Sequence, residues 1–315
     1  MSNLKRLLDG RRELDPRMEF DIALMESGVD AGRRAEIMKS FVNACAVAEA
    51  TMGERSGKPY APLLGDSSRL ARQLSEAMLG PESIFNYPEE FMKIHEYLAS
   101  GGNVIITPNH ESGVDNMALF ALFNRINPDL NEKSVSIADS VPMDAEEAAF
   151  YNGFNRIQVY SQQSISESPE DADDMKSRNR SALRELMRRV KQGGNLIILY
   201  PEGELDGGKL RHPSEGSSEI LEVVGRMSPK GSVIYPVHLT GTREIMPEDT
   251  GFDNMRKKLR SGKVTVNVGE PIDLGEFTSG VTGDTRPEFK RLAEDVMHMI
   301  AGLAEDPRKR GRYGR

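Results

Sequence analysis

Residues 101–123 have the sequence GGNVIITPNHESGVDNMALFALF. The apolar run at 103–107 follows a glycine pair and predicts a short buried strand. The apolar run at 117–123 predicts a helix, and the polar residues between the two runs predict a turn. This segment is therefore expected to fold as strand, polar turn and helix, which is the repeating unit of α/β proteins.

The same alternation continues toward the C-terminus. An amphipathic helix over residues 174–192 ends at a second glycine pair, and the apolar run LIILY at 196–200 follows it as a strand. Further elements are expected as strands at 135–138, 157–160, 233–239 and 263–268 and as helices at 218–225 and 286–303. We therefore expect an α/β fold in which helices flank a central mixed, largely parallel sheet.

The first hundred residues or so differ from the rest, because they contain no convincing strand. Helices are expected there at 18–25, 31–52, 67–78 and 88–99. We therefore divide the chain into a small N-terminal helical bundle at 1–85, an α/β domain at 86–305 and a basic flexible tail at 306–315.

Composition and charge exclude several classes of protein. The 315 residues include one cysteine, Cys45, which rules out a disulfide framework and a cysteine-based zinc cluster. The formal net charge of −8 argues against nucleic-acid binding. No apolar run approaches the ~18 residues of a membrane-spanning helix, and the N-terminus lacks the apolar stretch of a secretory signal. We therefore expect a soluble cytoplasmic protein, with the basic tail as a candidate for peripheral membrane contact.

The turn after the strand at 103–107 carries His110 and Asp115. Residues five apart do not share one helix face, so these two side chains meet only if the chain turns between them, which Gly113 makes easy. Asp115 would then fix the tautomer of His110 and leave the other ring nitrogen as a base. The alternative is a loop histidine beside an aspartate that caps the helix.

Two other polar segments also follow apolar strands. Glu202 and Gly203 come after the strand at 196–200, where Glu202 is suited to bind acceptor hydroxyls and Gly203 lets a substrate approach the backbone. Arg243 follows the strand at 233–239 and is a candidate anion clamp. Ligands of open α/β sheets bind at the carboxyl ends of strands, so the segments are expected to face one crevice. The alternatives are an ordinary Pro-Gly turn and, for His238, a core histidine.

These segments, read together, resemble the glycerolipid acyltransferase superfamily. Its mark is N-H-x-x-x-x-D, then P-E-G after a strand, then an apolar strand with proline, and all three occur here in order. The resemblance is closest to soluble plastid-type glycerol-3-phosphate acyltransferases. It extends to the N-terminal helices and to four further stretches, at 159–161, 176–186, 193–197 and 245–247.

The resemblance implies an enzyme that transfers a fatty acyl group from acyl carrier protein or coenzyme A to a hydroxyl of glycerol 3-phosphate or a related acceptor. His110 would remove the proton of the attacking hydroxyl while Asp115 orients it. A backbone N–H near Gly203 would stabilise the oxyanion. No acyl-enzyme, metal or other cofactor is implied, in keeping with the lack of a G-x-S-x-G motif.

The sequence departs from the plastid pattern where those enzymes hold phosphate. Basic residues of the family are replaced by Gln162-Gln163-Ser164 and by Glu204-Leu205-Asp206. If the acceptor carries a phosphate, the candidates to bind it here are Arg178, Arg180, Lys209, Arg211 and Arg243. An acidic carrier protein would need a basic docking patch, for which residues 256–260 and the helix face with Arg184, Arg188, Arg189 and Lys191 are candidates.

Other functions stay open at this point. One is an acyltransferase for an acceptor without phosphate, such as a lysolipid, an amine or a secondary metabolite. Another is a thioester hydrolase that uses the same base to activate water, and a third is a non-catalytic carrier-binding or lipid-binding protein. Metal and nucleotide enzymes are disfavoured, because the chain has no H-E-x-x-H, G-x-x-x-x-G-K-[ST] or G-x-G-x-x-G motif.

Overall fold

The strands of the computed structural model form one sheet. The structure describes residues 15–55, 58–140, 144–203, 212–246, 259–279 and 285–305. Within these ranges the sheet has nine strands in the order β1-β5-β4-β6-β3-β7-β8-β2, and β9 pairs with β7. Their bounds are Tyr60–Ala61 (β1), Ile84–Asn86 (β2), Asn103–Pro108 (β3), Ser134–Asp139 (β4), Arg156–Val159 (β5), Leu196–Ile198 (β6), Ser232–Thr240 (β7), Thr265–Val268 (β8) and Ile272–Asp273 (β9).

The central strands run parallel to one another. β5, β4, β6, β3 and β7 are neighbours in that order, and each pairs in parallel with the next. β1 pairs with β5 in the antiparallel sense, as do β8 and β9 with β7, whereas β2 is parallel to β8. This confirms the expected mixed, largely parallel sheet, and it brings the carboxyl ends of five strands to one edge.

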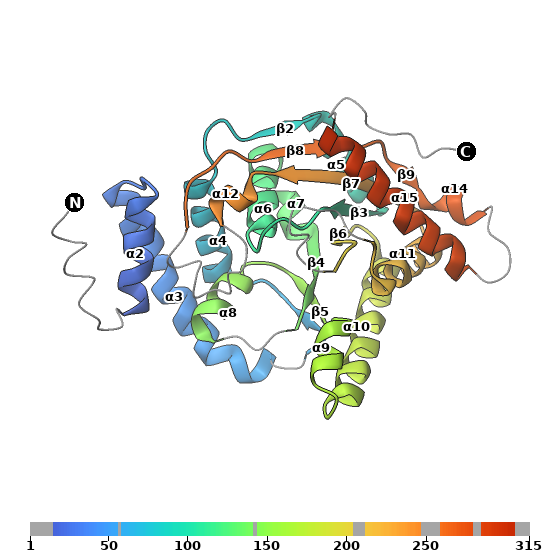
Figure 1. Ribbon diagram of the computed structural model, residues 1–315, viewed down its shortest axis with the longest axis horizontal. Helices are drawn as coiled ribbons and strands as arrows, with labels where there is room; N and C mark the ends of the chain where they lie inside the picture. The colour runs from blue at the N-terminus through green and yellow to red at the C-terminus, as the bar shows by residue number, and fades with distance from the viewer. Residues whose placement is uncertain are drawn as a thin grey trace.

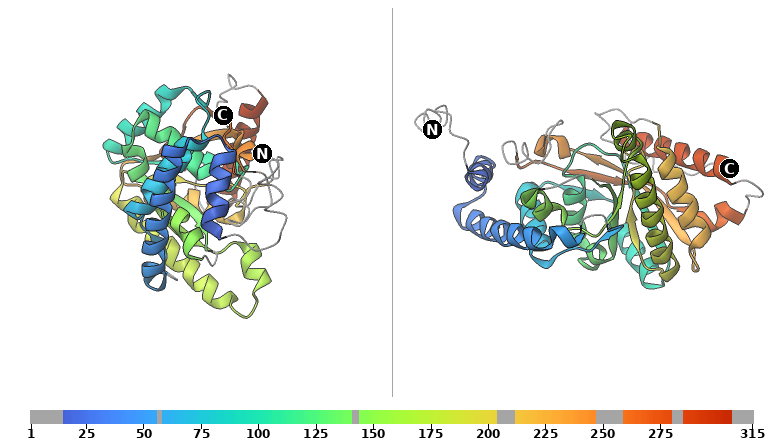
Figure 2. Two further views of the ribbon diagram at one scale, coloured as in Figure 1. Left: turned by 90° about the vertical axis from the view of Figure 1, so that its left-hand side faces the viewer. Right: turned by 90° about the horizontal axis from the view of Figure 1, so that it is seen from below.

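Successive residues of the central strands pack on opposite faces of the sheet. On β3, Val104 and Ile106 lie in one hydrophobic cluster and Ile105 lies in the other. Because both faces are buried, these strands are apolar throughout rather than alternating. Two helical layers enclose the sheet (Figures 1 and 2).

The helices of the first layer are α2 (Pro16–Glu26), α3 (Ala31–Arg55), α4 (Gly65–Met78), α5 (Pro88–Ala99), α6 (Asp115–Ile126), α7 (Asp129–Lys133), α8 (Ala145–Tyr151) and α12 (Thr242–Ile245). The second layer contains α10 (Ala172–Gln192), α11 (Glu215–Met227), α14 (Leu274–Ser279) and α15 (Arg286–Glu305), and the short α9 (Gln162–Glu167) precedes α10.

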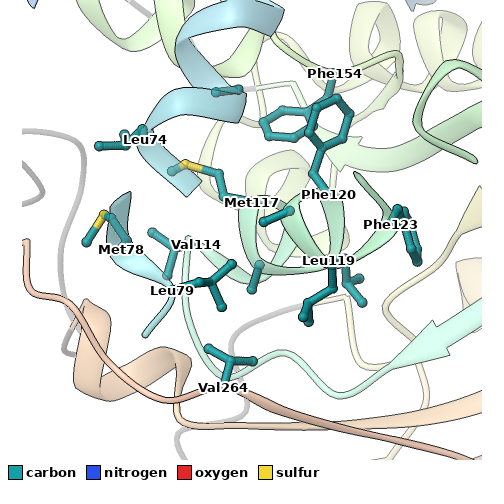
Figure 3. Close-up of a cluster of buried hydrophobic side chains, with 14 of the residues drawn as sticks. Leu74, Met78, Leu79, Val114, Met117, Leu119, Phe120, Phe123, Phe154 and Val264 are labelled. Carbon is teal, nitrogen blue, oxygen red and sulfur yellow. The ribbon is translucent and has the colours of Figure 1, made fainter. Parts of the chain in front are cut away.

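The N-terminal helices share a core with the α/β part of the chain. Phe20 of α2 and Phe41 of α3 are fully buried and lie 5.6 and 5.5 Å from the ring of Phe150 on α8. Figure 3 shows Met78 of α4 in the same cluster as Met117 of α6. Residues on both sides of position 85 thus pack together, and the division into domains at that position stays a prediction.

The expectation that the first hundred residues contain no strand is wrong for β1 and β2. These strands have only two and three residues, which is too short to show a period, and Ile84 of β2 is 44% exposed. They form because β5 and β8 would otherwise leave their outer backbone groups unpaired. Their position is therefore set by tertiary pairing rather than by local sequence.

The longer predicted elements are confirmed. Helices expected at 31–52, 67–78, 88–99, 174–192 and 286–303 correspond to α3, α4, α5, α10 and α15. The helices α7, α8, α9, α12 and α14 are not predicted, because four to seven residues make at most two helical turns. The predicted tail at 306–315 lies outside the described residues. Among the described helices, none is long and apolar enough to cross a bilayer.

Candidate active site

His110 and Asp115 meet at the carboxyl edge of the sheet. The Nδ1 atom of His110 lies 2.8 Å from Oδ2 of Asp115, and the Asp115 side chain is fully buried at the start of α6. The same oxygen accepts the backbone N–H of Ser112 at 3.0 Å. A carboxylate in this place favours the tautomer with its proton on Nδ1, which leaves Nε2 as the acceptor of a proton.

Side chains from the turn anchor it to β7 and α12. The amide of Asn109 accepts from the N–H of Leu239 at 2.7 Å and donates to the carbonyl of Leu239 at 3.1 Å, as a strand backbone would. The hydroxyl of Ser112 donates to the carbonyl of Met246 at 3.1 Å. These bonds hold the turn on both sides of His110.

Gly113 fits into this turn because it has no side chain. Its φ is not positive, so the left-handed freedom of glycine is not what the turn requires. A Cβ at this position would lie 2.7 Å from Cε of Met246, so a larger residue would have to displace that side chain. The turn that the sequence predicts is present. Glycine is needed at position 113 because of packing against Met246, and not because of its backbone conformation.

Arg243 lies beside the histidine turn. Its Nε donates to the backbone carbonyl of Glu111 at 3.3 Å. The carboxylate of Glu111 accepts from the N–H of Gly241 and from the hydroxyl of Thr242, both at 3.1 Å. Gly241 has φ +99°, and a Cβ there would collide with the carbonyl oxygen of Lys263, so this position requires glycine. The structure thus bonds Arg243 to Glu111, the residue that directly follows His110 in the chain.

The Pro-Glu-Gly turn follows β6, the parallel neighbour of β3. The carbonyl of Pro201 accepts from the N–H of Ser214 at 2.8 Å and from the hydroxyl of Ser217 at 2.7 Å, which ties the turn to α11. Glu202 is buried, and Gly203 has φ +75°. The N–H of Gly203 donates to the carbonyl of Tyr200 at 3.1 Å, so in this conformation it is engaged within the turn rather than directed at an oxyanion.

Tyr200 and Asn116 complete the surroundings of His110, and sequence reasoning missed both. The Tyr200 ring stacks on the imidazole with centroids 4.1 Å apart. Its hydroxyl donates to Oδ1 of Asn116 at 3.0 Å. Burial, with a smaller contribution from Asp115, raises the pKa of Tyr200 well above its usual value of 10. The available signals were an aromatic residue directly before Pro-Glu-Gly and an amide directly after Asp115.

Two of the other candidate cations lie on α10, away from this turn. Arg178 pairs with Asp174 at 2.7 Å and donates to the hydroxyl of Tyr160, which follows β5, at 3.4 Å. β5 is three strands from β3, or ~14 Å at the usual strand spacing. Arg180 is exposed. Lys209 and Arg211 lie outside the described residues.

The proposed docking patches receive limited support. On α10, Arg188 and Arg189 both pair with Glu185, at 2.6 and 2.9 Å, which reduces the positive charge of that face. Residues 256–258 of the second patch lie outside the described ranges.

His238 is half-buried and contacts the hydroxyl of Thr240 at 3.2 Å, so the expectation of a core histidine is wrong. Its strand pairs with β8 near the sheet edge, which leaves that side chain partly accessible.

Residues 91–240, which contain the His110 turn and the Pro-Glu-Gly turn, match the family model described as Acyltransferase. This segment is an acyltransferase domain. The resemblance read from the sequence motifs is thereby confirmed.

Curated relatives of this acyltransferase domain are plastid enzymes. The chain is 29% identical over 166 residues to a glycerol-3-phosphate acyltransferase, chloroplastic, of Arabidopsis thaliana, which covers 50% of this chain and 36% of that protein. It is 28% identical over 211 residues to the protein of the same name from Pisum sativum, covering 63% and 42%. The chain thus spans less than half the length of these two relatives.

A solved structure is also similar. The 1-acyl-sn-glycerophosphate (LPA) acyltransferase PlsC from Thermotoga maritima aligns over 76% of this chain and 82% of that chain, with a TM-score of 0.45 and 17% identity.

The cysteine is unsuited to act as a nucleophile for the acyltransferase domain. Cys45 lies on α3, partly buried against the first hydrophobic cluster. Desolvation by burial is the main cause that raises the pKa of its thiol from 9.0 to about 12. The thiol therefore stays protonated at physiological pH, and a protonated thiol is a weak nucleophile.

A small apolar pocket adjoins the first turn of α6. It lies between α4, α6 and α12 and is lined by Ser75, Met78, Leu79, Val114, Met117, Ala118 and Ile245. Figure 3 shows Met78, Leu79, Val114 and Met117 around this region. Because Val114 precedes Asp115 in the chain, the pocket begins within one helical turn of the partner of His110.

Proposed function

We propose that this chain transfers a fatty acyl group from an acyl thioester to a hydroxyl of glycerol 3-phosphate or a related glycerolipid acceptor. The observation that carries the proposal is the contact of 2.8 Å between His110 and the buried Asp115 inside an acyltransferase domain. The side chain of His110 is 24% exposed, so an acceptor can reach it, whereas Asp115 is shielded from water.

In the proposed reaction the acceptor hydroxyl attacks the carbonyl carbon of the thioester. Nε2 of His110 takes the hydroxyl proton, and Asp115 stabilises the resulting imidazolium through Nδ1. The tetrahedral intermediate then breaks its carbon–sulfur bond, and the imidazolium returns the proton to the leaving thiolate. The products are an ester and a free thiol, and the enzyme carries no acyl group at any stage.

Two side chains are proposed to hold the acceptor. Among the candidate cations that the structure describes, Arg243 is the one that donates a hydrogen bond to the histidine turn. A guanidinium suits a phosphate because it offers several donors in one plane. Glu202 is buried in the turn at the end of the neighbouring strand, where its carboxylate is proposed to accept from an acceptor hydroxyl. Arg178 and Arg180 are less suited, because β5 and β3 are separated by two strands.

The apolar pocket beside α6 has a volume of only about 10 Å³ in this structure, and we propose that it opens to receive the start of the acyl chain. Its lining is apolar apart from Ser75, and it includes two methionines. Methionine side chains are unbranched and adapt readily, so the pocket can widen when a chain enters.

The donor is proposed to be a thioester of acyl carrier protein or of coenzyme A. No cofactor is assigned to the reaction, and the location in the cytoplasm likewise stays a prediction.

One observation favours a second candidate, acyl transfer to an acceptor without phosphate. The stretch after the Tyr-Ser segment, where plastid enzymes are basic, is Gln162-Gln163-Ser164, and here it forms the first turn of α9 with Ser161 as its cap. Among the described residues, Arg243 is the one candidate guanidinium that bonds the histidine turn, and a site with so few cations would suit a lysolipid or an amine. Thioester hydrolysis needs the same base and is the third candidate.

One set of assays separates these candidates. The purified 315-residue chain is mixed with a long-chain acyl thioester, on carrier protein and on coenzyme A, with glycerol 3-phosphate, a lysolipid, an amine or no acceptor. Lysophosphatidate that forms only with glycerol 3-phosphate supports the main proposal. Transfer only to the lysolipid or amine supports the second candidate, and thiol release without any acceptor supports a hydrolase. The variant His110→Ala is the control for background aminolysis and hydrolysis.

A further inference from the structure

The ring of Tyr200 covers one face of the His110 imidazole. The two ring centroids are 4.1 Å apart and the ring planes differ by 25°. Tyr200 lies two residues after the end of β6, and it is 7% exposed, so it has little freedom to leave this position. A buried aromatic ring in such contact limits how the smaller ring can turn.

The hydroxyl of Tyr200 is tied to the helix that carries Asp115. It donates to Oδ1 of Asn116 at 3.0 Å, and the same oxygen accepts from the hydroxyl of Ser136 on β4 at 3.2 Å. Asn116 directly follows Asp115 in the first turn of α6. The stacked ring and the carboxylate are therefore held by one helical turn, and they approach His110 from two directions.

These two contacts restrain different motions of the imidazole. The bond to Asp115 restrains the position of Nδ1, but one hydrogen bond tolerates a range of angles, so the ring can still tilt about χ2. Rotation about χ2 of histidine has a broad energy profile, so one hydrogen bond does not define the ring plane. The face of Tyr200 removes that rotation and leaves Nε2 pointing in one direction.

We propose that Tyr200 is a positioning residue that sets the plane of His110 for proton transfer, with Asn116 and Ser136 holding Tyr200. The proposal rests on the proposed acyl transfer. Small errors in the placement of a general base reduce turnover more than substrate binding, because alignment matters most in the transition state.

The kinetic test compares Tyr200→Leu and Tyr200→Phe. Leucine removes the flat face, so kcat is expected to fall roughly tenfold while KM changes less than about twofold. Phenylalanine keeps the face and loses only the bond to Asn116, so kcat is expected to stay within about threefold of wild type. The matched control is Phe154→Leu, which removes a buried ring of the same cluster that packs on Phe120. That control is expected to lose stability and keep kcat.

A spectroscopic test does not depend on activity. The ring protons of His110, assigned with the variant His110→Gln, feel the ring current of Tyr200 and are expected to resonate upfield in wild type. Tyr200→Leu should move them downfield, and Tyr200→Phe should restore the wild-type shifts. The nitrogen shifts of the same ring report whether Nδ1 keeps its proton.

Each outcome decides the proposal. A kcat of Tyr200→Leu equal to wild type, or an equal loss in Phe154→Leu, would overturn the positioning role. Unchanged His110 ring-proton shifts in Tyr200→Leu would show that the stack is absent in solution and would also overturn it. Failure of the proposed function looks different, since the wild-type chain would then transfer no acyl group while the His110 signals still report the stack.

Discussion

The histidine turn after β3 and the arginine-bearing helix after β5 lie at the same edge of the sheet but differ in how they are built. The first is held by hydrogen bonds from β7, α12 and α6 and collects His110, Asp115 and Arg243 in one place. The second carries Arg178, which is paired with Asp174 on its own helix. The groups suited to proton transfer are therefore gathered at one turn, whereas the charge of Arg178 is balanced on its own helix.

The largest effect is expected from removing the base. His110→Ala should lower kcat by roughly a thousandfold, because no other described side chain takes its place beside Asp115. The measurement is acceptor-dependent ester formation from a long-chain acyl thioester. The matched control is His238→Ala, a half-buried histidine of β7, which should keep wild-type turnover. Comparable losses in both variants would mean that the histidine turn has no special role.

The next effect concerns the tautomer of His110. Asp115→Asn presents an amide N–H to Nδ1 and favours the tautomer that is protonated on Nε2, which cannot accept a proton. We expect kcat to fall by about a hundredfold or more with little change in KM. Asp129→Asn, on an exposed position of α7, is the control. A normal kcat in Asp115→Asn would remove the orienting role.

A smaller effect is expected when the arginines of the two regions are replaced. Arg243→Gln should raise the KM for glycerol 3-phosphate about tenfold or more and lower kcat less, because a guanidinium–phosphate contact is lost in the bound state. Arg178→Gln should leave that KM near wild type. The reverse result would move the acceptor phosphate to the end of β5. Equal KM values in all three proteins would favour an acceptor without phosphate.

The elements that sequence reasoning predicted are those with a long local pattern. The runs at 103–107 and 196–200 are apolar because both sheet faces are buried, and this signals central parallel strands. β1 and β2 carry no such signal, since these two edge strands form through pairing with β5 and β8. The contact of His110 with Asp115 was predictable because both residues lie within one short turn.

The rest of the site depends on contacts between distant segments. Tyr200 reaches His110 because β6 and β3 are neighbours in parallel register, with Ile106 opposite Ile198. Arg243 reaches the turn because β7 is the other neighbour of β3. Strand order is not encoded in local periodicity, so the sequence suggested five cations without indicating which of them approaches the histidine.

A weaker effect is expected from a substitution in the apolar pocket proposed to bind the acyl chain. Ala118→Val narrows the apolar pocket beside α6, and we expect kcat/KM for long-chain donors to fall a few-fold relative to short-chain donors. The short-chain donor is the internal control, because the chemistry of His110 is the same for both. Equal losses for both donors would mean that the chain does not enter this pocket.

The smallest effect is expected at the cysteine. With a thiol pKa raised to about 12 by burial, Cys45 stays in the unreactive thiol form below that pH, so iodoacetamide at pH 8 should leave the native chain unmodified over minutes. Cys45→Ala should keep wild-type kcat. Mass spectrometry and steady-state rates measure both, and loss of activity in Cys45→Ala would point to an acyl-cysteine intermediate.

Direct transfer to an acceptor that His110 activates can be followed by rapid mixing. Enzyme, acyl thioester and glycerol 3-phosphate are mixed, and free thiol and lysophosphatidate are followed together in wild type and in His110→Ala. We expect thiol and ester to rise with one rate constant in wild type and neither to rise above background in the variant. A burst of thiol before any ester, or ester formation in His110→Ala at the wild-type rate, would contradict it.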